Sequence, residues 1–240
     1  MSRRPMHAPR APCLAALCLA AVLLAGCGGP AEDVSVPAGT PVVLISVDTL
    51  RSDRLPMYGY DGVETPALDE LRRDAILFEH AFSPMPLTLP SHGSMLTGLL
   101  PAGHGVRDNG GYTLETEGLP WLPRILREAG YRTGAAVSAF VLRGGTGLAA
   151  DFELYEDHIV QTQWPGSVQR TGDLTLEASR GWLREVGEEP FFFFFHVFEP
   201  HRPYEPPEPF ASRYGVGYDA EVASADRIVG DLLDELRELG

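Results

Sequence analysis

Short apolar runs along the chain alternate with stretches in which apolar residues recur at helical spacing. The run Val42 to Val47 is interrupted only by Ser46 and ends on Asp48. A short run rich in β-branched residues is typical of a strand buried on both faces. Phe191 to Val197, five Phe followed by His and Val, predicts a buried central strand. Tyr131 to Leu142 predicts another strand.

Helical spacing predicts helices between these strands. They are expected over residues 65–76, Ser91 to Leu99, Trp121 to Ala129, Thr171 to Val186 and Asp219 to Leu239. The expected inward positions are Leu68, Leu71, Ala75 and Ile76 in the first, Leu122, Ile125 and Leu126 in the third, and Leu174, Ala178, Trp182 and Val186 in the fourth. Residues 77–82 suit a short strand, and Ser83 to Pro90, with three prolines, suits a stiff loop.

This alternation predicts an α/β fold. Strands separated by helices favour a mostly parallel sheet with helices on both faces, which is a three-layer α/β/α sandwich. The sequence shows no internal repeat. Residues 41–240 are therefore expected to form one domain.

The first residues have the layout of an export signal. Arg3, Arg4 and Arg10 precede an apolar run, Ala11 to Ala25, that is too short to remain as a membrane helix. It closes on Leu-Ala-Gly-Cys27, which resembles a bacterial lipobox. We expect residues 1–26 to be a lipoprotein signal peptide, Cys27 to be lipidated, and residues 27–40 to be a flexible tether. The alternative is an ordinary cleaved signal with an incidental Cys.

Composition supports an exported protein that does not bind nucleic acid. The other two cysteines, Cys13 and Cys18, lie inside the signal, which leaves no internal disulfide in the mature domain. The formal net charge is −14, and it becomes −17 when the three arginines of the signal are removed. Such acidity argues against nucleic acid as a partner. We expect a membrane-anchored lipoprotein that faces the periplasm or the cell exterior.

Polar residues gather where the strands end. Asp48 ends one strand, Thr88 and His92 lie where a loop enters a helix, and His196 and His201 lie at or after the end of the Phe strand. Because the carboxyl ends of parallel strands meet at one edge, these groups are expected to converge there. On the sequence alone, Asp48 fits equally well as the cap of a turn, and His196 as a buried strand residue.

A hydroxyl and a carboxylate at this edge suggest metal-assisted chemistry. A helix N-terminus favours a bound anion, but Thr88 is a weak nucleophile unless a metal ion or a base activates it. Asp48 supplies a hard oxygen ligand for such a metal. Arg51 either steadies the substrate anion or pairs with Asp53.

Several ordered motifs resemble the N-terminal part of the sulfatase family, within the alkaline-phosphatase superfamily. They are VVLISVDTLRSDRLPMYGY, TPALDELRRDAILFEHAF, TLPSHGSMLTGLLPAGHGV and FFFFFHVFEPHRPY. The resemblance implies an α/β/α sandwich and a metal-dependent hydrolase of sulfate or phosphate esters. It assigns Asp48 and Thr88 to a divalent metal (calcium, or zinc, manganese or magnesium), Thr88 to the nucleophile, and His201 to the substrate anion. Arg51 and His92 are further expected substrate contacts.

The chain departs from the family pattern at several of these positions. Sulfatases carry Cys or Ser where this chain has Thr88, which cannot be oxidised to formylglycine. Thr49 stands where a second metal-binding Asp is usual, and His92 where an Arg is expected. Val137 to Phe140 replaces a segment with Lys and His, and the chain has no Lys at all. Thr nucleophiles occur in related phosphodiesterases and phosphoryl-group transferases, which leaves phosphoryl chemistry on envelope components as an alternative.

In the family, a helix like the last one here leads to a strand ending in Asp-His-Gly, which completes the metal site. This chain ends at Gly240, so we expect a C-terminally incomplete fold, from either a fragment or a degraded copy. Asp157-His158 is expected to be an unrelated surface pair. Three functions remain open at this stage: an ester hydrolase, a transferase, and a protein without activity.

Overall fold

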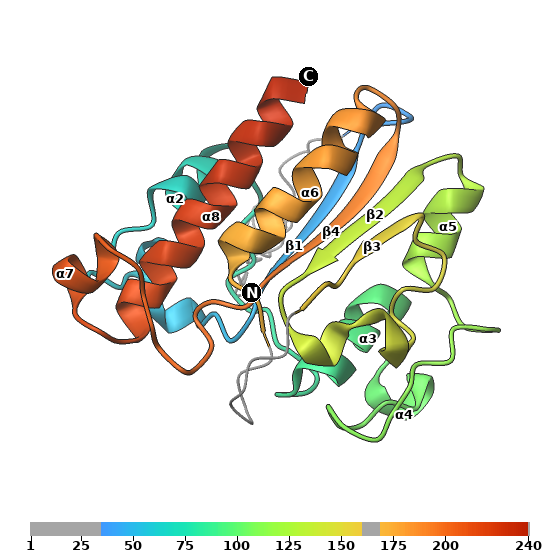
Figure 1. The fold of residues 1–240 in the computed structure, drawn as a ribbon, viewed down its shortest axis with the longest axis horizontal. Helices are drawn as coiled ribbons and strands as arrows, with labels where there is room; N and C mark the ends of the chain where they lie inside the picture. Colours follow the sequence, from blue (N-terminus) through green and yellow to red (C-terminus); the bar gives the residue numbers. More distant parts are fainter. Residues whose placement is uncertain (1–34, 160–168, 240) are drawn as a thin grey trace, which may run out of the picture. The chain divides into compact units, whose positions relative to one another are not determined.

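The computed structural model describes residues 35–159 and 169–239, and these residues fold around a parallel sheet. The sheet order is β1-β4-β2-β3, from β1 (Val42–Val47), β4 (Phe191–Val197), β2 (Arg132–Val137) and β3 (Leu154–Glu156). Every neighbouring pair of strands is parallel. The predicted central position of the Phe strand is confirmed, since β4 lies between β1 and β2 (Figure 1).

Helices follow the strands in the order that the sequence predicts. They are α2 (Pro66–Leu71), α3 (Thr88–Thr97), α4 (Pro101–His104), α5 (Leu122–Glu128), α6 (Gly172–Val186), α7 (Phe210–Tyr214) and α8 (Tyr218–Leu239). Short 3-10 turns, η1 to η5, occupy Ser52–Arg54, Pro56–Tyr58, Arg72–Asp74, Phe140–Leu142 and Gly144–Thr146. Among the described residues, no helix combines the length and the apolar character that crossing a membrane requires.

The alternating side chains of β4 build a core on each face of the sheet. Phe192 and Phe194 pack with residues of α3 and α5 on one face. Phe193 and Phe195 pack with residues of α6 and α8 on the other. The predicted three-layer α/β/α arrangement is therefore confirmed, with α6 and α8 in front of the sheet in Figure 1 and α3 and α5 on the other side.

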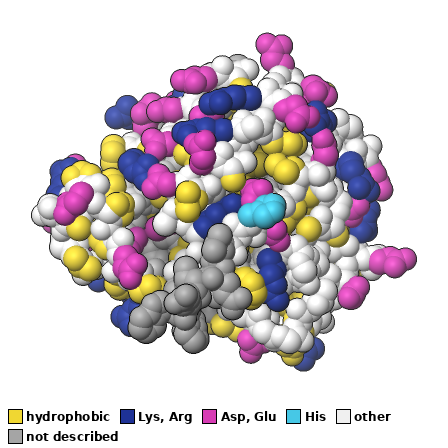
Figure 2. Space-filling model, in the orientation of Figure 1, with side chains coloured by type: hydrophobic (Ala, Val, Ile, Leu, Met, Phe, Trp, Pro, Cys, Tyr) yellow, Lys and Arg dark blue, Asp and Glu magenta, His cyan; other side chains and the backbone are white. Residues whose placement is uncertain are grey.

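The outer face of α6 and α8 is strongly charged. Figure 2 shows acidic and arginine side chains interspersed across it. Ion pairs join the two helices here, as between Arg180 and Glu235 at 3.0 Å, and between Arg227 and Asp173 at 2.7 Å. Local pairing with arginine thus offsets part of the repulsion among the acidic side chains on this face.

Several element predictions were wrong in extent. The helix expected from Ser91 begins at Thr88, because Pro90 falls in its first turn, where a backbone N–H has no partner to lose. The strand from Tyr131 ends at Val137 and gives way to a 3-10 turn. The three-residue β3 was not anticipated.

The segment after α2 does not form the strand that we expected over residues 77–82. It runs without regular structure, and Ile76, Phe78 and Phe82 are 73%, 69% and 87% exposed. Ile125 and Leu174, expected to face the core, are also exposed. On α6 the buried face is shifted by about one residue and includes Thr175, which the apolar pattern alone does not reveal.

Candidate active site at the carboxyl edge of the sheet

The structure brings Asp48 and Thr88 together. Asp48 follows β1, and its N–H still donates to the carbonyl of Val197 at 2.9 Å, which ties it to β4. Its side chain is largely buried. The Thr88 hydroxyl is 3.3 Å from Asp48 Oδ2 and donates to it. Two groups 40 residues apart in the sequence thus meet at one edge of the sheet.

Thr88 lies at the first position of α3, where free backbone N–H groups face outward. One of these groups, the N–H of Leu89, donates to Asn109 Oδ1 at 2.9 Å. The positive end of this ten-residue helix favours negative charge near the Thr88 oxygen. Asn109 therefore helps to fix the helix entry that carries the hydroxyl.

A cavity of about 260 Å³ opens in front of these groups. Asp48, Thr88, Asn109 and His201 contribute polar atoms to its lining. His201 Nδ1 donates to the carbonyl of Arg202 at 2.6 Å, and its ring lies 4.5 Å from that of Phe198. The loop after β4 thus places the His201 imidazole, fixed by these contacts, at the same cavity as the Thr88 hydroxyl.

His92 does not line the cavity, but it contacts Thr88, which does. Its Nδ1 donates to the carbonyl of Thr88 at 2.7 Å, and its Nε2 accepts from the Ser46 hydroxyl at 2.8 Å. Burial, with a smaller contribution from His196, lowers the pKa of His92 to about 3. The expectation that His92 contacts the substrate in place of an arginine does not fit this neutral, fully engaged ring.

His196 is buried beside Asp48. Its Nε2 lies 3.6 Å from Asp48 Oδ2, which is longer than a hydrogen bond, and neither ring nitrogen has a partner. Burial acts to raise the pKa of Asp48, but the nearby rings of His196, His201 and His92 together lower it by more, so the net shift is downward. Asp48 is therefore an ionised carboxylate at neutral pH.

The turn after Asp48 is fixed by α8. Thr49 has a left-handed backbone with φ of 55°, and its carbonyl accepts from the Tyr218 hydroxyl at 2.7 Å. The same hydroxyl accepts from the N–H of Arg51 at 2.9 Å. Burial raises the pKa of Tyr218 to about 12, which keeps the phenol protonated for this bridge. The Arg51 guanidinium pairs with Asp53 at 2.6 Å, in agreement with one of the two roles that the sequence allows.

Other residues near this edge have roles that the sequence left open or did not reveal. Glu199 lies outside the Asp48 cavity and accepts from the N–H of Gly172, at the start of α6, at 3.1 Å. Phe140 and Gln169 line the Asp48 cavity. Asn109 lies between Asp108 and Gly110, a composition typical of turns, so the sequence alone gives it no functional role.

The described residues suit a divalent metal in kind but not in number. Asp48 and Thr88 offer oxygen atoms, and His196 offers buried nitrogens without partners. Within residues 35–159 and 169–239, no three His, Cys, Asp or Glu side chains gather closely enough to hold a metal. Calcium takes six to eight oxygen ligands. The described groups alone therefore do not complete a metal site.

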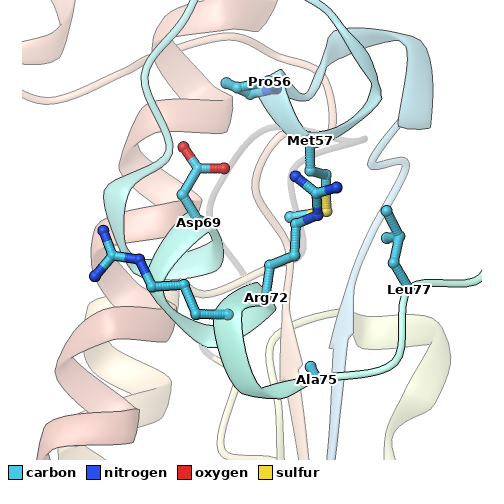
Figure 3. A pocket seen from close by; sticks show the side chains of 7 residues that line it. Pro56, Met57, Asp69, Arg72, Ala75 and Leu77 are labelled. Atoms are coloured by element: carbon cyan, nitrogen blue, oxygen red, sulfur yellow. The ribbon is translucent and has the colours of Figure 1, made fainter.

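A larger hollow, of about 640 Å³, lies elsewhere on the fold. It is bordered by α2 and the turns η2 and η3, and Figure 3 shows Asp69, Arg72, Met57 and Leu77 around it. It holds no histidine and no hydroxyl. Its size alone does not make it a candidate for catalysis.

A parallel α/β sandwich with a hydroxyl, a carboxylate and an imidazole at its carboxyl edge is the architecture of a ligand-binding α/β protein. Comparison with known proteins identifies the family. The sulfatase family model matches residues 40–240, and the chain therefore belongs to the sulfatase family.

Its relatives are considerably longer. Human N-acetylgalactosamine-6-sulfatase is 25% identical over 85% of this chain and 48% of its own length. N-acetylglucosamine-6-O-sulfatase of Bacteroides thetaiotaomicron is 23% identical over 78% of this chain and 35% of its own length. The chain thus spans about half the length of the human relative and about a third of the length of the bacterial one.

Solved structures share the fold. Phosphonate monoester hydrolase of Agrobacterium radiobacter superposes with a TM-score of 0.67 at 19% identity, covering 83% of this chain and 60% of that one. A structure of another protein in complex with its substrate, D-glucosamine-2-N,6-O-disulfate, superposes with a TM-score of 0.68 at 17% identity, covering 83% of this chain and 62% of that one. At these identities the likeness establishes the fold alone.

Proposed function

We propose that this chain carries the nucleophile-bearing part of a metal-dependent sulfatase-type hydrolase, with Thr88 as the nucleophile. The observation that carries the proposal is the Thr88 hydroxyl at the start of α3, 3.3 Å from the ionised Asp48. Family membership supports sulfate esters as the substrate class. Two relatives are named for 6-sulfated sugars, which makes sulfated sugars the first substrates to test.

In the proposed reaction the Thr88 oxygen attacks the sulfur of a sulfate ester. A bond forms from Thr88 Oγ1 to sulfur as the Thr88 proton passes to Asp48, the ester S–O bond breaks, and the leaving alcohol takes up a proton from solvent. Water then cleaves the threonine sulfate ester and releases sulfate. The Thr88 proton points at Asp48, and His201 binds the substrate anion.

A bound divalent metal would stabilise the negative charge on the reacting group. Asp48 and Thr88 would contribute to holding it, together with groups beyond those described. The fixed helix entry at Asn109 and the clamped turn at Thr49 keep the two oxygens in place. Preorganisation of this kind contributes to catalysis because the geometry is set before the substrate arrives.

Replacement of the nucleophile tests the proposal. Thr88→Val removes the hydroxyl at nearly constant shape, and we expect at least a hundredfold loss of aryl sulfate hydrolysis, with partial activity in Thr88→Ser. Thr113→Val, at an exposed threonine, is the matched control. The assay needs added divalent metal. Equal turnover by wild type and Thr88→Val would refute the assignment.

A second candidate function is favoured by Thr88 itself. Threonine cannot become formylglycine, and a threonine nucleophile suits phosphodiester hydrolysis or phosphoryl-group transfer to an envelope alcohol. The same variants assayed on a phosphodiester, with and without an alcohol acceptor, separate these activities. A product carrying the moved group on the acceptor identifies the transferase.

We also propose export and lipid anchoring through Cys27, which lies outside the described residues. The Leu-Ala-Gly-Cys27 motif after an apolar run supports this proposal. Palmitate labelling in a bacterial host should mark the wild-type chain and not Cys27→Ala. Equal labelling of Cys13→Ala and wild type is the expected control. Label retained in Cys27→Ala would exclude the anchor.

A further inference from the structure

Beside the Asp48 cavity lies a second cavity of about 500 Å³, which we call the arginine cavity. Its volume falls within the range of small-molecule sites. It is lined by Arg51, Arg54, Arg202, Tyr204, Tyr218 and His201, together with the turn residue Thr49. His201 also lines the Asp48 cavity, so one imidazole borders both.

The lining of the arginine cavity is cationic. It contains three arginines and no carboxylate, in a chain with a formal net charge of −14. Asp53 pairs with Arg51, and Asp219 lies 3.4 Å from Arg54, but neither acid lines the cavity. Within the described parts of the chain, Arg202 contacts Tyr204 and forms no ion pair with an acidic side chain. The cavity therefore has cationic charge that the protein itself does not fully compensate.

The cavity wall is held in place by aromatic side chains. The Arg202 guanidinium lies 5.4 Å from the centre of the Tyr204 ring, and Tyr204 meets Tyr218 edge to face at 6.0 Å. Tyr218 in turn bridges Thr49 and Arg51. Arg202 Nε also donates to the Tyr204 hydroxyl at 3.4 Å, which positions the guanidinium. A guanidinium can bind carboxylate or sulfate oxygens through two N–H groups, a geometry that lysine does not offer.

The plain alternative is that these arginines only solvate the surface and balance nearby acids. That explanation covers Arg51 and Arg54, each of which has an acidic neighbour. It does not cover Arg202, or the sharing of His201 with the cavity that holds Thr88. An anion in the arginine cavity and an ester at Thr88 would lie on the two sides of one imidazole.

We propose that the arginine cavity is a second anion subsite, which binds a further sulfate group of a polyanionic sugar ester whose reacting ester lies at Thr88. This inference rests on the proposed function and names its substrate class. Arg202 supplies the uncompensated charge, and Arg51 and Arg54 add to the field. The subsite selects esters with two anionic groups over those with one.

The test compares two sugars on the full chain, by titration calorimetry with added divalent metal. They are glucosamine-2-N,6-O-disulfate and N-acetylglucosamine 6-sulfate. Arg202→Gln is the test variant. Arg73→Gln, at an exposed arginine bordering the other hollow, changes the net charge equally and is the matched control. Thermal melts verify that all variants fold.

We expect wild type and Arg73→Gln to bind the disulfated sugar about fivefold more tightly than the monosulfated one, and Arg202→Gln to lose that preference with monosulfate binding unchanged. Inorganic sulfate should not tighten the binding of the monosulfated sugar. In the proposal, the second sulfate adds affinity because it is joined to the first within one sugar. Equal binding of the two sugars by wild type, or an unchanged preference in Arg202→Gln, overturns the subsite alone. Binding of neither sugar, without Thr88-dependent hydrolysis, overturns the proposed function as well.

Discussion

At the scale of single residues, His196 is a fully buried imidazole without a hydrogen-bond partner at either ring nitrogen. A buried unsatisfied polar group costs about 1–3 kcal/mol. Its neighbours on β4, Phe195 and Val197, are fully buried apolar side chains. We therefore expect the position to accept an apolar ring of similar size, with only the 3.6 Å approach of Nε2 to Asp48 Oδ2 lost.

We predict that His196→Phe raises the melting temperature by about 2–4 °C, since it removes about 1 kcal/mol of unfavourable burial. Thermal unfolding followed by circular dichroism measures this. His104→Phe is the matched control: that ring is buried with Nε2 3.0 Å from the Ser94 hydroxyl, and loss of this hydrogen bond should lower the melting temperature. A clear drop for His196→Phe would contradict the prediction.

At the scale of elements, α6 packs on β2 through a close approach at Gly134. A Cβ built there would lie 2.6 Å from the Trp182 ring. Trp182 has little room to retreat, because its ring stacks on Phe193 at 5.5 Å and meets Phe191 edge-on at 6.1 Å. The missing side chain of Gly134 thus sets how closely the helix lies on the sheet.

Gly134→Ala should destabilise the fold by about 1–3 kcal/mol through overpacking. Gly181→Ala is its counterpart on α6, where a Cβ meets nothing within 4 Å, and it should stabilise by about 0.5–1 kcal/mol through helix propensity. Urea unfolding of both variants gives the two free energies. The same sign for both would show that the packing argument is mistaken.

At the scale of the whole molecule, Glu221 couples stability to pH. It lies on α8 with 4% exposure and accepts from the N–H of Glu205 at 2.6 Å. Burial, with repulsion from Glu199 and Glu205, raises the pKa of Glu221 to about 7 from its ordinary 4.5. The folded state therefore holds this proton more tightly than the unfolded state. The stability that this protonation contributes is fully present below about pH 4.5 and is lost as the pH rises through about 7.

Glu221→Gln keeps the oxygen that accepts from Glu205 and removes the buried charge. We predict equal melting temperatures for variant and wild type near pH 4.5, and a variant more stable by about 2–4 °C at pH 8, which allows about 1 kcal/mol after solvent screening. Glu238→Gln, exposed at the end of α8, should show no such trend. Melting across this pH range decides. A constant difference at all pH values would exclude the coupling.

The sequence predicted what depends on local pattern and failed where tertiary contacts decide. The five consecutive phenylalanines of β4 are enough to place it at the centre of the sheet. The strand expected over residues 77–82 did not form, because a strand needs a neighbour and no pairing partner for this segment is present among the described strands. The meeting of Asp48 and Thr88 was predictable from strand-end topology. The burial of the His92 ring was not predictable, since it depends on a hydrogen bond with the Ser46 hydroxyl on β1, which is distant in the sequence.

The position of β1 at the margin of the described sheet has a dynamic consequence. Asp48 directly follows β1, and within residues 35–159 and 169–239 this strand is hydrogen-bonded to a neighbour, β4, along one edge only. Amide protons on the other flank should exchange with deuterated solvent well before those of β4. A protein segment that paired with β1 along that edge would slow this exchange and restrict the motion of the Asp48 carboxylate. The exchange rate of these amides would therefore report on what borders β1.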